Sequence, residues 1–370
     1  MDETTEARVV SDHLGAEPVV VDFGAEEVLA HYPRLIQAAE GPVVDTSCAA
    51  LMLLAQEVHR RGYKVVLTGE GADEWLAGYP WYKISKILSW LDIIPGLSLS
   101  QWARRLFVKL SGSPNYTRAQ MQRVFDTVGG HNPWLDIYGL MSLNKLRFYS
   151  SDLQRELADH IPYADLCPNL ERIKRWHPLN RGLFFAGRAH LAGHLLNAKG
   201  DRIAMHSSVE TRYPFLDEEV VDFLATLHPS LKMKGLREKY ILRKTAQRWV
   251  PRSVAWRSKA MFRAPFDSFH LDKVPPYVEQ LLSAEALQRT GYFDPEGVRQ
   301  WREKFKTLRP GSKMRISIEM GLAGVFATQL WHQTYIDDSL ADVPTVYNAA
   351  AARNGAAATV AGAGAAQGGW

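Results

Sequence analysis

Glycines alternate with carboxylates directly after an apolar run in residues 65–74, VVLTGEGADE. The apolar run is typical of a buried strand, and α/β proteins bind ligands at the carboxyl ends of parallel strands. Gly69 and Gly71 let the backbone turn sharply and approach a ligand closely. Glu70 and Asp73 are suited to a divalent metal and the polyphosphate that it bridges. The alternative is an ordinary strand-to-helix turn whose acids cap the next helix.

A second polar segment, GDRIAMHSSVETRYPFLDEEVV, occupies residues 200–221. Arg202, Glu210, Arg212 and Asp217 surround a short apolar stretch in it. A buried arginine–carboxylate pair is costly unless it serves a function, so the segment is a candidate functional region. The alternative is an ion-paired junction between helices.

A third segment, GLREKYILRK at residues 235–244, places Lys239 four positions before Arg243. This spacing predicts that both side chains lie on one side of a helix. A lysine and an arginine that meet acidic groups can bind phosphates or stabilise a charged transition state. The alternative is a basic helix face in contact with solvent.

The elements around these segments indicate an α/β beginning and a helical continuation. Helices are predicted at 4–14, 25–38 and 45–62, with buried strands at 18–23 and 64–69. Beyond residue 75 no strand is predicted. The predicted helices there are 98–110, 117–127, 144–159, 185–200, 218–227, 238–249, 275–288, 296–306 and 314–334. The Ala/Gly-rich end, 347–370, is predicted to be disordered.

Composition excludes several classes of protein. The 370 residues are 46% hydrophobic and 23% charged, with a net charge of +4, which favours a globular protein and gives no indication of nucleic-acid binding. The two cysteines, Cys48 and Cys167, form no metal or disulfide pattern. The longest apolar stretch, 88–108, is too polar to span a membrane, and the first residues lack a signal-peptide core. We therefore expect a cytoplasmic protein without a membrane partner.

Taken together and in this order, the segments resemble the synthetase domain of asparagine synthase-type amidotransferases. That family carries a [ST]-G-E-G-x-D-E strand end, matched by Thr68 to Glu74 and followed by a similar Gly78-Tyr79. It also carries a GDR…M…S…E-x-R…PFLD signature and an EKY-[IL]-LR helix. These are matched by Gly200 to Asp217 and by Glu238 to Arg243. Residues 250–266 and 321–333 resemble two later family segments, so that the likeness extends over residues 2–336.

The resemblance implies an α/β fold: an incomplete ATP-pyrophosphatase-type (adenine nucleotide alpha hydrolase-like) parallel sheet, followed by a mainly α-helical region. The sheet part would occupy residues 1–75 and the helical part 76–346. It also implies that ATP activates a carboxylate with release of pyrophosphate, and that an amine then attacks the acyl-adenylate. The implied cofactors are ATP and Mg²⁺.

The resemblance also assigns roles to individual residues. Asp73 would hold the metal and pyrophosphate, Glu70 would lie beside the acyl-adenylate as a proton acceptor, and Lys239 would neutralise developing negative charge. The residues expected at ATP or pyrophosphate are Gly69, Gly71, Asp73 and Arg243. The residues expected at the substrate or in the site wall are Asp45, Ser47, Arg202 and Glu210, and Lys259 lies in a loop that would cover the site.

Two parts of the family pattern are missing from the sequence: the Ser-Gly-Gly-x-Asp-Ser pyrophosphate loop and the glutaminase with its terminal cysteine. In the family's 3-2-1-4-5 strand order, 18–23 and 64–69 would be the non-adjacent third and fourth strands. Parallel strands need neighbours, so we expect the chain to require a glutaminase/pyrophosphate-loop segment or subunit. The alternatives are an inactive fragment and a non-catalytic helical binding protein. The substrate stays open as a small-molecule or peptide carboxylate, with aspartate the default, and the nitrogen source as ammonia or another amine.

Overall fold

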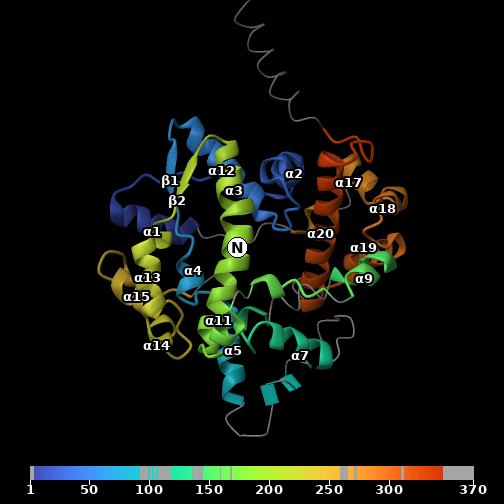
Figure 1. The fold of residues 1–370 in the computed structure, drawn as a ribbon. Coiled ribbons are helices and arrows are strands. Elements are labelled where there is room, and N and C mark those ends of the chain that lie inside the picture. The colour runs from blue at the N-terminus through green and yellow to red at the C-terminus, as the bar shows by residue number, and fades with distance from the viewer. Residues whose placement is uncertain are drawn as a thin grey trace, which may run out of the picture.

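Helices make up most of the described chain, and a single pair of parallel strands accompanies them (Figure 1). The computed structural model describes residues 4–344 except 92–98, 101, 104–105, 107–117, 136–137, 139–144, 159, 167–168, 259–265, 271–272 and 310–311. The predicted cover-loop residue Lys259 and the predicted disordered end, 347–370, therefore lie outside the described residues.

The α-helices follow the sequence predictions closely at the N-terminus and in the last third of the chain. The α-helices are α1 (Thr4–Leu14), α2 (Ala25–Ala39), α3 (Ser47–Arg60), α4 (Ala72–Trp75), α5 (Pro80–Leu91), α7 (Arg118–Thr127), α9 (Ser151–Glu156), α10 (Leu170–Lys174), α11 (Pro178–Phe185), α12 (Arg202–His206), α13 (Glu218–Thr226), α14 (Pro229–Lys232), α15 (Tyr240–Ala246), α16 (Arg252–Ala255), α17 (Pro276–Leu281), α18 (Ala284–Thr290), α19 (Pro295–Thr307) and α20 (Lys313–Tyr335). Three short 3₁₀ segments, η1 (Ala164–Leu166), η4 (Pro214–Leu216) and η5 (Phe266–His270), lie between them.

The sheet corrects the sequence prediction in three respects. Strand β1 (Val65–Leu67) pairs in parallel with β2 (Glu210–Arg212), in a register that sets Leu67 opposite Arg212. Strand β2 was not predicted, because its residues, Glu-Thr-Arg, contain no apolar run. Strand β1 was predicted to be buried, yet Leu67 is 73% exposed. Residues 18–23 form no strand, since a β-branched run adopts a strand only where another backbone is at hand to pair with it.

The largest hydrophobic core lies away from the sheet, around α20. Leu322, Phe326 and Leu330 of α20 are fully buried, and Tyr32 of α2 packs edge-on against Phe269 of η5 at 4.6 Å between ring centroids. Helices α2, α17, α18 and α19 and segment η5 surround α20, whereas α12 contacts β2 on one side and α2 and α3 on the other (Figure 1). Helix α12 thus connects the strands to the core.

The predicted helix at 185–200 is present, but much of it winds as a π-helix. Its π-helical parts are η2 (Ala186–Leu195) and η3 (Asn197–Asp201), which show five-residue hydrogen bonds such as Leu196 N–H to Leu191 O at 2.8 Å. Such turns are rare and are frequently found at functional sites. None of the described helices combines the length and the apolar character needed to cross a membrane.

Candidate active site

The turn after β1 depends on a glycine at residue 71. Thr68 N–H donates to Arg212 O at 2.9 Å, which continues the strand pairing up to the turn. Gly71 then adopts a left-handed φ of 93°, and a Cβ built there would lie 2.4 Å from Leu216 Cδ2. Only glycine accepts both this φ and this approach without strain. The turn therefore packs directly against the Tyr-Pro-Phe-Leu-Asp stretch of the second polar segment.

Asp73 and Lys239 form the centre of the site. Lys239 Nζ lies 2.7 Å from Asp73 Oδ1, and the two side chains are only 19% and 15% exposed. Lys239 N–H donates to Leu76 O at 3.0 Å, so the third segment is also attached to the turn through its backbone. Gly78 makes room for the pair, because a Cβ there would lie 1.7 Å from Asp73 Oδ1. All three segments singled out in the sequence thus meet at one place.

A second carboxylate in the turn, Glu74, is fully buried. It accepts hydrogen bonds from Gly71 N–H at 3.0 Å and from the Tyr79 hydroxyl. Burial raises the pKa of Glu74 to about 7, and the nearby negative charges of Asp73 and Glu70 act in the same direction. The site therefore contains a carboxyl group that exchanges a proton near neutral pH. No separate role was predicted for Glu74 from the sequence.

Glu70 of the turn is partly buried and interacts electrostatically with Lys199, which belongs to a second group of polar residues around Asp45. Lys199 of η3 lies 3.2 Å from Asp45 Oδ2. Burial alone would lower the pKa of Lys199, but the interactions with Asp45, with Cys48 and, more weakly, with Glu70 outweigh it and raise that pKa above its ordinary value. Lys199 therefore interacts with two carboxylates, and neither interaction could be recognised from the sequence.

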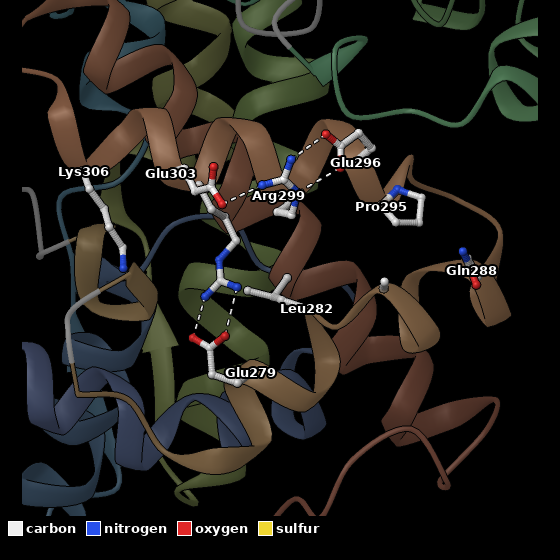
Figure 2. A pocket seen from close by; sticks show the side chains of 10 residues that line it. Glu279, Leu282, Gln288, Pro295, Glu296, Arg299, Glu303 and Lys306 are labelled. Atoms are coloured by element: carbon white, nitrogen blue, oxygen red, sulfur yellow. Dashed lines mark hydrogen bonds and ion pairs between the residues drawn. The ribbon is translucent and has the colours of Figure 1, made fainter.

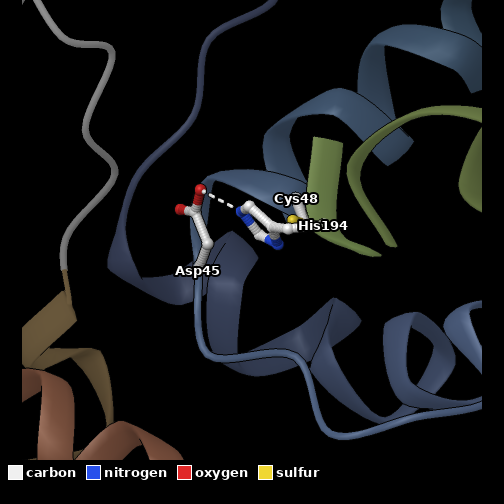
Figure 3. Close-up of side chains that lie close together, drawn as sticks. All are labelled: Asp45, Cys48 and His194. Atoms are coloured by element: carbon white, nitrogen blue, oxygen red, sulfur yellow. Dashed lines mark hydrogen bonds and ion pairs between the residues drawn. The ribbon is translucent and has the colours of Figure 1, made fainter. Parts of the chain in front are cut away.

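Asp45 is an ionised carboxylate at the edge of the site. His194 Nε2 of η2 lies 3.3 Å from its Oδ2 (Figure 3). Ser47 N–H donates to its Oδ1 at 2.9 Å. Burial alone would raise the pKa of Asp45, yet the His194 hydrogen bond and the Lys199 charge hold that pKa well below its usual range. The predicted substrate residues Asp45 and Ser47 contact each other. Asp45 is linked to Glu70 because both carboxylates interact with Lys199.

With this geometry established, comparison with known proteins decides the family. The sequence matches the family described as asparagine synthase over residues 1–333.

The chain belongs to the asparagine synthase family.

Its relatives are distant but similar over most of the chain. It is 26% identical to "Amidase chyE" of Penicillium rubens, over 86% of this chain and 49% of that protein. It is 25% identical to "Amidase chry2" of Gibberella zeae, over 79% and 46%, respectively. It is 24% identical to "Asparagine synthetase [glutamine-hydrolyzing] 1" of Bacillus subtilis, over 90% and 50%. The chain spans about half the length of these curated relatives. The family membership predicted from the three segments is confirmed.

Arg243, from the motif that resembles the family's EKY helix, contacts protein groups. Its guanidinium donates to the Glu238 carboxylate, to Glu238 O at 2.7 Å and to Ala255 O at 3.1 Å. Glu238 is 2% exposed and also pairs with Lys83. Helix α15 begins only at Tyr240, with Lys239 as its N-cap at a positive φ of 50°, so the predicted shared helix face does not form. This geometry favours a structural role for Arg243, which pairs with the buried Glu238 carboxylate and with backbone carbonyl groups.

The structure places Arg202 and Glu210 away from the Asp73–Lys239 pair. Arg202 donates to Ala39 O at 2.8 Å and to Glu40 at 2.7 Å, at the end of α2. Glu210 pairs with Arg212 at 2.8 Å on the solvent side of β2, where the two side chains are 54% and 59% exposed. Neither contact is the buried arginine–carboxylate pair that the sequence suggested, and both fit the ion-paired junction named as the alternative.

A separate surface hollow lies between α17, α18 and α19 (Figure 2). Its charges are largely paired with each other: Arg302 binds Glu279 through two hydrogen bonds of 2.6 and 3.0 Å, and Arg299 binds Glu296 and Glu303. None of the predicted site residues lines it. We assign no reaction chemistry to this hollow.

Proposed function

We propose that this chain is the synthetase part of an ATP-dependent, amide-forming ligase of the asparagine synthase type. ATP would convert a small-molecule or peptide carboxylate into an acyl-adenylate, and ammonia or another amine would then attack it. The observation that carries the proposal is the Asp73–Lys239 pair, on which three distant segments converge at the end of β1. Aspartate is the first substrate to test, because several relatives are named asparagine synthetase.

The residues of the turn divide the chemistry between them. Lys239 supplies a largely buried positive charge that would stabilise negative charge on the adenylate and on leaving pyrophosphate. Glu70 would accept a proton from the attacking amine. The positively charged Lys199 interacts electrostatically with Glu70. Gly69 and Gly71 would allow phosphates to approach the backbone of the turn.

Asp73 is compatible with the way proteins usually bind Mg²⁺. Among the described residues it belongs to no cluster of three or more metal-binding side chains. Magnesium in nucleotide sites commonly uses one or two carboxylates and takes its other ligands from phosphates and water. Asp73 would supply that carboxylate, and the ion when bound would neutralise negative charge on the phosphates.

We further propose that a glutaminase/pyrophosphate-loop segment or subunit completes the protein, on the same polypeptide or on another. The relatives are about twice as long as the matched region. Strand β1 also leaves Val65 and Leu67 exposed at 39% and 73%, as expected of a strand that lacks neighbours. Additional parallel strands beside β1 would complete the ATP-pyrophosphatase-type sheet, and the whole enzyme would work in the cytoplasm.

The test is ATP-dependent pyrophosphate release by the chain combined with its completing portion. Lys239→Ala and Asp73→Ala are expected to abolish release while the circular dichroism spectrum stays unchanged. Lys244→Ala is the matched control, because Lys244 lies in the same segment with its side chain exposed. Wild-type turnover in Lys239→Ala, or no release by the wild-type combination with any carboxylate offered, would refute the proposal.

A further inference from the structure

Three side chains of types that bind metals lie together outside the strand-end turn. One oxygen of Asp45, the sulfur of Cys48 and one ring nitrogen of His194 all lie within 4.8 Å of one another (Figure 3). Asp45 lies just before α3 and Cys48 in its first turn, whereas His194 is 149 positions from Asp45 and belongs to η2. We propose that this cluster binds a transition metal ion with affinity for sulfur, with Zn²⁺ as the first candidate.

The ligand set matches the preferences of zinc. Zinc takes thiolate sulfur, imidazole nitrogen and carboxylate oxygen at about 2.0–2.3 Å, in a tetrahedral arrangement. Neighbouring ligand atoms in such a shell are then roughly 3.3–3.8 Å apart. The separation of His194 Nε2 and Asp45 Oδ2 is already 3.3 Å. The widest separation in the cluster needs a contraction of only roughly 1 Å, which small side-chain rotations provide.

The charge of Lys199 narrows the choice of ion. Its ammonium lies 3.2 Å from the same Asp45 oxygen and opposes any cation that enters. Mg²⁺ and Ca²⁺ bind oxygen ligands and would gain nothing from Cys48. A zinc ion gains a bond to sulfur, and the proton that Cys48 gives up leaves behind a negative charge that offsets the repulsion. The arrangement therefore selects for an ion that bonds to sulfur.

Access and completion of the shell also fit. Cys48 is fully buried, whereas the side chains of Asp45 and His194 are 21% and 29% exposed, so that the cluster opens to solvent on one side. Three protein ligands leave the fourth position for water, as in many catalytic and regulatory zinc sites. The buried hydroxyl of Thr46, in the same turn, has no hydrogen-bond partner within the described part of the chain.

The test uses the full chain after treatment with a chelator, with Co²⁺ as the spectroscopic probe. We expect one equivalent of Co²⁺ to give a thiolate-to-cobalt charge-transfer band, and Zn²⁺ to abolish it by competition. Cys48→Ser should remove the band and weaken Zn²⁺ binding, measured by calorimetry, by at least about tenfold. Cys167→Ser, which changes the other cysteine of the chain, is the matched control and should retain both signals.

His194→Ala provides a second variant, should Cys48→Ser fail to fold. It is expected to weaken Zn²⁺ binding by a similar factor while the thiol of Cys48 remains present. The absence of a charge-transfer band in the wild-type chain would overturn the proposal. So would a band that disappears in Cys167→Ser, or Zn²⁺ binding that is unchanged in both the Cys48 and the His194 variants.

Discussion

Replacing Gly71 by alanine should damage the turn, whereas the same change at Gly69, two residues earlier, should not. Gly71 has a φ of 93°, and its new Cβ would lie 2.4 Å from Leu216 Cδ2. A non-glycine residue in a sparsely populated backbone region costs about 1–3 kcal/mol. Overpacking against Leu216 adds about 1–3 kcal/mol, although rotation of the leucine relieves part of the clash. We therefore expect Gly71→Ala to lower the free energy of unfolding by about 2–5 kcal/mol.

Gly69→Ala is the matched control for this prediction. Gly69 has no positive φ, and no atom would lie within 4 Å of its Cβ, so the free energy of unfolding should change by less than about 0.5 kcal/mol. Urea denaturation followed by tryptophan fluorescence compares the three proteins, with the difference read from the midpoints at a constant slope. Equal midpoints for both variants would contradict the reasoning, because they would show that the turn tolerates a side chain at Gly71.

Two further predictions concern buried charge. The folded-state pKa of Glu74 is raised from 4.5 to about 7, so the folded protein holds a proton that the unfolded chain has already released. The free energy of unfolding should accordingly fall by about 3 kcal/mol as the pH rises from about 4.5 to 7. Glu74→Gln should flatten this pH dependence, measured by urea titrations at several pH values. An unchanged pH dependence in Glu74→Gln would contradict the raised pKa of Glu74. Arg243→Ala should cost about 1.5–3 kcal/mol of stability, because it removes charged hydrogen bonds to the buried Glu238 carboxylate, which keeps Lys83 as its other partner. Unaltered unfolding together with weakened ATP binding would instead support the phosphate role predicted from sequence.

The candidate site was largely predictable where it rests on short motifs. Asp73, Gly71 and Lys239 were selected because residue types that bind phosphate and metal recur at family spacing, and these residues meet in the structure. Glu238 and Glu74 received no role, although both lie inside the motifs. Both carboxylates are notable because they are buried, and burial disfavours the charged form of a carboxylate. A sequence motif does not show whether a residue is buried.

Other site residues were unpredictable for geometric reasons. His194 and Lys199 lie about 150 positions from Asp45 along the chain, and only the folding of η2 and η3 against α3 brings them to it. Arg202 was predicted to lie in the site wall because its segment resembles a motif of the family. Its long side chain instead reaches the carbonyl of Ala39 at the end of α2. A sequence motif indicates which backbone segment lies near the site, but it does not give the direction in which a long side chain points.

The family could be predicted from its motifs. Most of the helices and the turn that carries Asp73 could be predicted from the local spacing of apolar residues, glycines and charges. The pairing of strands, the burial of carboxylates and the interactions between charged groups distant in sequence depend on the tertiary structure. The run at 18–23 has the composition of a strand and remains irregular, whereas the polar Glu210–Arg212 becomes one. A strand is defined by hydrogen bonds to a neighbour, and the identity of that neighbour is a property of the whole fold.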